Sequence, residues 1–142
     1  MLILDTNVIS ELMRDQPNPD VVAWIDSQPS DSIWTTTVSV FEICTGIELL
    51  PDGKRAQTLR EGFEKCLTQI FDRRVLYFDV TAARIAAVLA KQRYQAGLAY
   101  EIRDIQIAGI VSARNGSLAT RNVKDFQQMN LPLINPWGSQ AT

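Results

Sequence analysis

Short apolar runs alternate with longer amphipathic stretches along this chain. The short runs are rich in β-branched and aliphatic residues, which is typical of buried strands. They predict strands at residues 2–4, 33–37, 75–78, 118–120 and 131–134. Between them, apolar positions repeat at helical spacing and predict helices at residues 8–13, 21–25, 39–50, 55–71, 81–96 and 105–113, with a short helical turn within 121–126.

This alternation of strands and helices predicts an α/β fold in three layers. Helices should cover both faces of a central, mostly parallel five-stranded sheet. The segment 105–113 is apolar on nearly every side, so it should be a central, buried helix. The last strand contains Pro132, which lacks a backbone N–H, so this strand should lie at an edge of the sheet.

A single domain is expected from the size and composition. The chain has 142 residues, of which 46% are hydrophobic and 21% charged, as in ordinary globular domains. No repeat, low-complexity tract or linker divides it. We predict one domain over residues 1–138 and a loose C-terminal tail over residues 139–142.

Features that the sequence lacks exclude several classes of protein. No apolar run approaches about 18 residues, so no membrane span is expected, and without a secretory signal the expected location is the cytoplasm. Without histidine the chain cannot form a Ser-His-Asp or Cys-His triad, or a zinc site that needs histidine. Cys44 and Cys66 lie among apolar residues and should be free and buried. The net charge of −2 argues against a generic polyanion-binding surface but permits a local basic patch.

The first candidate functional residue is Asp5, which directly follows the predicted strand at residues 2–4. Ligands of parallel sheets bind just beyond the carboxyl ends of the strands, where Asp5 stands. Thr6 and Asn7 are then expected to cap the helix that begins at Val8. Asp5 alone fits a helix cap equally well, because acids favour helix N-termini.

Four further acids lie at or near predicted strand–helix junctions, and each has a purely structural alternative. Glu42 lies beside the apolar stripe of its helix and could be a solvated helix-face residue. Asp104 could cap the buried helix, and Glu101, three residues earlier, could be an exposed loop acid. Asp125 could form a capping box with Asn122.

If these junctions meet at one end of a parallel sheet, the carboxylates converge. Converged carboxylates without histidine form a hard oxygen site, which suits Mg²⁺ or Mn²⁺. Mg²⁺ pairs naturally with phosphate oxygens, and a metal-activated water can hydrolyse a phosphodiester bond.

Five stretches together form a specific pattern over the whole domain: residues 2–11, 40–43 with Gly46, 101–108, 119–122 and 135–137. In these stretches the chain resembles the PIN-domain family of ribonucleases, and more narrowly the FitB-like branch of the VapC toxins of type II toxin–antitoxin systems. The resemblance implies the PIN fold and a Mg²⁺- or Mn²⁺-dependent endoribonuclease. By the same analogy Asp5, Glu42 and Asp104 are catalytic, metal-site acids and Thr6 is a supporting hydroxyl.

The fourth acid is where the chain departs from its nearest relatives. FitB-like members can carry Asp directly after the Thr-Arg pair, where this chain has Asn122. Asp125 is a usual acid in other VapC-like members. Either Asp125 therefore completes the catalytic set, or Asn122 supports the site as a neutral oxygen ligand, with Glu101 as a further candidate supporting residue.

The resemblance also implies partners. A small VapB/FitA-like antitoxin should insert its tail into the active-site cleft, and DNA contact should belong to the antitoxin. A homodimer is implied as well, and Trp24, Trp34 or the helix at residues 55–71 could supply its surface or could be core. The implied substrate is RNA. The sequence does not show which RNA is cut, because contacts to phosphates carry no information about the bases.

Two alternatives remain open at this stage. An aspartyl-phosphate phosphatase would also place Asp after an apolar strand, but the second Asp of that motif is missing after Asp5. The other alternative is a catalytically weak PIN-fold protein that only binds antitoxin or RNA. Its support in the sequence is Asn122, which stands where FitB-like members can carry Asp.

Overall fold

The five strands of the molecule form one parallel sheet. The computed structural model describes residues 1–138, and the loose tail predicted at residues 139–142 lies outside the described residues. The strand order is β3-β2-β1-β4-β5, and each neighbouring pair is parallel. The strands are β1 (Leu2–Leu4), β2 (Ile33–Thr36), β3 (Val75–Leu76), β4 (Ser117–Ala119) and β5 (Leu133–Ile134). The predicted α/β fold is confirmed, and the strand after Pro132 is an edge strand as predicted.

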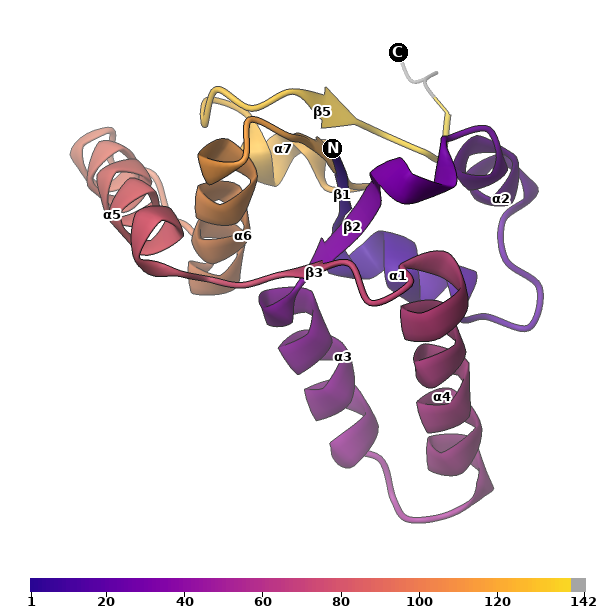
Figure 1. Cartoon of the computed structure of the whole chain (residues 1–142). Helices are drawn as coiled ribbons and strands as arrows, with labels where there is room; N and C mark the ends of the chain where they lie inside the picture. The colour runs from indigo at the N-terminus through magenta and orange to yellow at the C-terminus, as the bar shows by residue number, and fades with distance from the viewer. Residues whose placement is uncertain (139–142) are drawn as a thin grey trace.

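Helices cover both faces of this sheet (Figure 1). On one side lie α1 (Thr6–Leu12), α2 (Pro19–Asp26) and α4 (Lys54–Lys65). On the other side lie α5 (Val80–Gln95), α6 (Ile102–Ala113) and α7 (Val123–Phe126). Helix α3 (Thr37–Glu48) pairs with α4, and the two project beyond the sheet. The short helices η1 (Ser30–Ser32) and η2 (Cys66–Ile70) complete the described elements.

The sheet divides the core into two apolar clusters. Successive strand side chains point to opposite faces, so Leu2 and Leu4 face the α1–α4 cluster while Ile3 faces the α5–α6 cluster. Helix α6 is buried on several sides, as its apolar sequence predicts, and Ile107 and Val111 are fully buried. Trp24 and Trp34 are half-buried against the two clusters.

Helices α5 and α6 make the most extensive helix–helix contact of the described fold. Their close approach depends on Gly109. A Cβ atom on Gly109 would lie 2.5 Å from the Ala82 carbonyl oxygen and 2.9 Å from Ala86 Cβ. Because both distances are below van der Waals contact, the helices can lie this close only while residue 109 has no side chain.

Two helices begin with a different cap residue from the one predicted. Asp5 is the N-cap of α1, because its carboxylate accepts the Thr6 backbone N–H at 2.8 Å. The predicted caps Thr6 and Asn7 lie inside that helix instead. Helix α6 begins at Ile102, with Glu101 as its N-cap, so Asp104 is a first-turn residue and not the cap.

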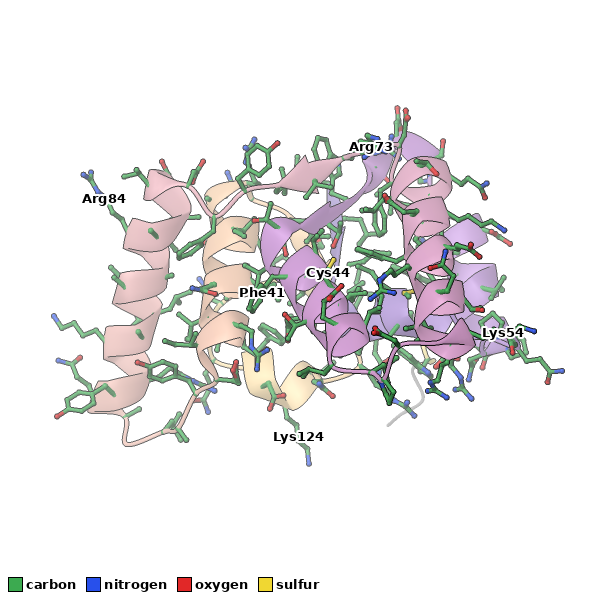
Figure 2. All side chains as sticks on the ribbon, turned by 90° about the horizontal axis from the view of Figure 1, so that it is seen from below. Phe41, Cys44, Lys54, Arg73, Arg84 and Lys124 are labelled. Carbon is green, nitrogen blue, oxygen red and sulfur yellow. The ribbon has the colours of Figure 1, made fainter. Side chains whose placement is uncertain are left out.

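Two further predictions are wrong. Asn122 stands at the N-cap position of α7, but its side chain makes no capping hydrogen bond, so the capping box with Asp125 does not form. Cys44 is exposed on α3, although Cys66 is buried and both thiols are free as expected. Figure 2 looks onto the end where α3 projects beyond the sheet and shows Cys44 there. Packing covers only part of α3 at this end, which sequence periodicity does not reveal.

Among residues 1–138, no helix combines the length and the apolar character that crossing a membrane requires.

Candidate active site

The predicted site residues line two adjoining cavities beyond the carboxyl ends of the central strands. The first has a volume of about 550 Å³, and the second about 460 Å³. Both are lined by Glu42, Asp104 and Asn122. Asp5 and Thr6 belong to the first cavity, and Glu101 and Asp125 to the second. The structure therefore brings together acids that are far apart in the sequence.

Asp5 is the most rigidly held of these acids. It is only 5% exposed. One carboxylate oxygen accepts the Thr6 N–H at 2.8 Å, and the other accepts the Thr120 hydroxyl at 2.8 Å and the Asn7 side-chain amide at 3.4 Å. Burial raises the pKa of Asp5, and the hydrogen bonds from Thr120 and Thr6 partly oppose this. Asp5 is thus both a helix cap and a member of the acidic site, and the two interpretations do not compete.

Asn7 forms hydrogen bonds to the residues that follow β1 and β4. Its side-chain amide donates to Asp5 and to the Thr120 hydroxyl, at 3.4 and 3.3 Å. Its side-chain oxygen accepts the Arg121 backbone N–H at 3.2 Å. One side chain therefore sets the position of the loop after β4 relative to Asp5.

Glu42 is held by groups from two neighbouring helices. Its Oε1 atom lies 2.7 Å from the Thr6 hydroxyl of α1, and that hydroxyl also lies 2.9 Å from the Ser39 hydroxyl. Its Oε2 atom lies 3.7 Å from Arg103 Nη1 of α6. Glu42 is half-buried and directed into the acid cluster, so the solvated helix-face alternative is wrong.

Asp104 carries the largest electrostatic penalty in the site. Burial, together with the negative charges of Asp5, Asp125, Glu101 and Glu42, raises its pKa to about 7. All of these effects act in the same direction, and no hydrogen-bond donor among residues 1–138 offsets them. Among residues 1–138, Arg103 pairs with Glu42, but no ion pair or hydrogen bond neutralises Asp104 itself.

Glu101 is exposed, as its loop-acid alternative predicts, but it is engaged in specific contacts. It accepts the Arg103 backbone N–H at 3.1 Å and pairs with the Arg103 Nε atom at 2.9 Å. These contacts lower the pKa of Glu101. Arg103 consequently links Glu101 to Glu42 at the rim of the cluster.

Asp125 and Asn122 lie on the β4–α7 side of the second cavity, and both are exposed. The negative charge of Asp125 contributes to the raised pKa of both Asp5 and Asp104, so Asp125 interacts electrostatically with the acid cluster. The Asn122 backbone N–H donates to the Thr120 hydroxyl at 3.0 Å. The choice between these two residues as the fourth member of the site stays a prediction.

Comparison with known proteins decides the family. The family model described as "PIN domain" matches residues 2–130. The chain belongs to the PIN-domain family.

Full-length relatives refine this assignment. The chain is 44% identical to the plasmid stability protein StbB of Pseudomonas syringae pv. tomato, 35% to toxin FitB of Neisseria gonorrhoeae and 36% to VapC ribonuclease Y4jK of Sinorhizobium fredii. Each match covers 96% of this chain and 98% or more of the relative. The solved structure of FitAB bound to an IR36 DNA fragment matches with a TM-score of 0.88 at 34% identity, covering 99% of this chain and 98% of that one. The resemblance drawn from the sequence is confirmed, and the PIN domain falls in the branch of VapC/FitB-like toxins.

The acidic residues of this PIN domain fit a hard divalent cation in donor chemistry and in charge. Asp5, Glu42 and Asp104 supply carboxylate oxygens to one cavity, and the raised pKa of Asp104 reports negative charge without compensation. Among residues 1–138, no three acids are already close enough together to form a ready-made metal-binding group.

The sequence did not identify several residues that build the site. Asn7 was expected only as a cap, and Ser39 and Thr120 were given no role. Asn7 follows Asp5 by two positions, and Ser39 precedes Glu42 by one helical turn, so proximity to a candidate acid was the available clue. Thr120 lies 115 positions from Asp5 and is found only through the pairing of β1 with β4.

We expect the metal-free PIN domain to lose stability as the pH rises. The folded-state pKa of Asp104 is about 7 against an ordinary value of 3.8, so between these values the folded state binds the proton more tightly than the unfolded state does. The stability that Asp104 contributes is then fully present below the ordinary pKa and is lost as the pH rises to about 7. Urea unfolding in chelator at a series of pH values measures this decline. Asp104→Asn should make it shallower, and an identical decline in the variant would contradict the assignment.

Proposed function

We propose that this PIN domain is the toxin of a type II toxin–antitoxin pair and acts as a Mg²⁺- or Mn²⁺-dependent endoribonuclease. The observation that carries the proposal is the convergence of Asp5, Glu42 and Asp104 on one cavity, with the charge of Asp104 uncompensated. The full-length similarity to a VapC ribonuclease supports it independently.

The chain's own residues divide the work of RNA hydrolysis. When bound, the divalent cation would supply charge neutralisation for the phosphate and activation of the attacking water. Asp5, Glu42 and Asp104 would hold that cation. Thr6 holds the Glu42 carboxylate in place, and the hydrogen bonds from Thr120 and Thr6 orient Asp5. Asp125 or Asn122 would complete the site.

Positive charge at the cavity rim would receive the RNA backbone. Arg14 and Arg121 line the first cavity and Arg103 the second. Arginine suits this task because its guanidinium group matches the geometry of phosphate oxygens. This local basic rim reconciles RNA binding with a net charge of −2.

The partners follow from the relatives. FitB and VapC relatives support a VapB/FitA-like antitoxin, which would cover the acidic cavities and neutralise the nuclease. The DNA fragment in the FitAB structure supports DNA binding by the complex, through the antitoxin. A homodimer in the cytoplasm completes the proposal.

The test is cleavage of total cellular RNA by the purified chain, freed of any partner. We expect cuts with Mg²⁺ or Mn²⁺ and none with chelator, because the acids need a cation to approach the phosphate. Mapping the new RNA ends would name the target. Cutting that persists in chelator would overturn the metal dependence. Metal binding without any cutting would instead favour the alternative of a catalytically weak partner protein.

A further inference from the structure

A cation–π stack of Arg121 on Trp137 lies at the edge of the acid cavity. The guanidinium carbon of Arg121 lies 4.9 Å from the centroid of the Trp137 ring. Both side chains line the same cavity as Asp5, Glu42 and Asp104. The stack therefore lies where the strand that carries a scissile phosphate would have to pass.

The stack is fixed relative to the acids. The Arg121 backbone N–H donates to Asn7 Oδ1 at 3.2 Å, and the amide of the same Asn7 side chain donates to Asp5. Trp137 packs against the apolar cluster beneath α1–α4, and its backbone N–H donates to Asn135 Oδ1 at 3.0 Å. Both members are thus held by the scaffold that positions the carboxylates.

Arg121 differs from the other two arginines of the rim. Arg14 pairs with Glu11 at 3.4 Å, and Arg103 pairs with Glu101 and Glu42. Within residues 1–138, no carboxylate lies within ion-pair distance of Arg121, and the residue is exposed. Its guanidinium group therefore contacts Trp137 and stays accessible to solvent.

We infer that Arg121 and Trp137 form a subsite for one unpaired ribonucleobase beside the scissile phosphate, with the base stacked on the open face of the Arg121 guanidinium. The inference rests on the proposed RNA cleavage. Unstacked RNA bases are commonly bound on aromatic rings and on arginine planes. A phosphate contact alone would require only a positive charge. A guanidinium group placed over an indole ring also offers a surface on which a base can stack.

A double-mutant cycle between protein and RNA tests the subsite. Binding of short single-stranded RNAs is measured in Mg²⁺ with the Asp104→Asn chain, which should bind without cutting. The RNAs carry one abasic ribose at successive positions. We expect the missing base to weaken binding about tenfold at one position, which is the value of one stacked base. Adding Arg121→Lys, which keeps the charge but removes the plane, should abolish that position-specific penalty.

Two further variants separate stacking from other causes. Trp137→Leu removes the ring beneath the guanidinium while leaving Arg121, and it should also reduce the position-specific penalty, with thermal unfolding used to verify the fold. Arg84→Lys is the matched control. Arg84 is exposed, projects outward from α5 and lines neither cavity (Figure 2). It should leave the penalty unchanged.

The possible results are distinguishable. If Arg121→Lys weakens every RNA equally, whatever position lacks its base, Arg121 contacts phosphate and the base subsite is wrong. If no abasic position matters while the unmodified chain still cuts RNA, the subsite is wrong and the nuclease stands. If the chain neither cuts nor binds RNA, both proposals are overturned.

Discussion

Replacing Asp104 with Asn should reduce RNA cleavage by more than about 100-fold and leave the fold intact. Loss of an outer-shell partner of a metal site already costs about 10–100-fold, and Asp104 is proposed to hold the cation itself. The fold does not need this charge, because Glu101 caps α6 and the pKa of Asp104 is raised in the folded chain. The variant should therefore unfold at a higher temperature than the parent above neutral pH in chelator.

A matched control comes from the start of another helix. Asp79 caps α5 by accepting the Ala82 N–H at 2.9 Å, and it lines neither acid cavity. Asn is as good an N-cap as Asp, so Asp79→Asn should keep both fold and cleavage. Calorimetric Mg²⁺ titration gives the second readout. Unchanged Mg²⁺ binding and cleavage in Asp104→Asn would remove Asp104 from the site.

The second large effect is on stability. Gly109→Ala should lower the free energy of unfolding by about 1–3 kcal/mol, because its Cβ atom would collide with the backbone oxygen of Ala82 on the facing helix. A backbone atom cannot rotate away as a flexible side chain can. Relief requires α5 and α6 to separate, which loosens the cluster around Ile107 and Val111. Urea unfolding of the two proteins measures the difference.

The same substitution should have the opposite sign on α4. Gly62 lies inside that helix, and a Cβ atom there would meet nothing within 4 Å. Gly62→Ala should therefore raise stability by about 0.5–1 kcal/mol, through lower backbone entropy of the unfolded chain. Destabilisation of similar size by both substitutions would show that the α5–α6 approach is not limited by residue 109.

The sequence was sufficient for the fold because each apolar run has one consistent period. Leu2–Leu4 could only be a short strand, and the all-round apolar character of residues 105–113 required a buried helix. The helix starts were less accurate, because the same residue types occur at the cap and in the first turn of a helix. Glu101 is the cap of α6 and Asp104 lies in its first turn. Asp5 is the cap of α1, where Thr6 and Asn7 were expected.

The acids of the site could be found because each lies near a strand–helix junction. Of the groups that hold these acids, only the Thr6 hydroxyl was expected, through the family resemblance. The contact of Thr6 with Glu42 and that of Thr120 with Asp5 depend on how α1 packs on α3 and how β1 pairs with β4. Those arrangements involve residues far apart in the sequence, so a local pattern carries no trace of them. The same holds for the stack of Arg121 on Trp137.

The bond between Thr120 and Asp5 spans 115 positions and has a consequence for protein synthesis. Asp5 is made 115 positions before its hydroxyl partner Thr120, and β1 is made before β4, the strand that pairs with it. β1 cannot pair with β4 on a chain that stops before residue 117. A nascent chain that stops before β4 therefore carries Asp5 without its Thr120 partner. On the proposed function, the damaging activity would appear only on chains in which β4 and Thr120 have been made.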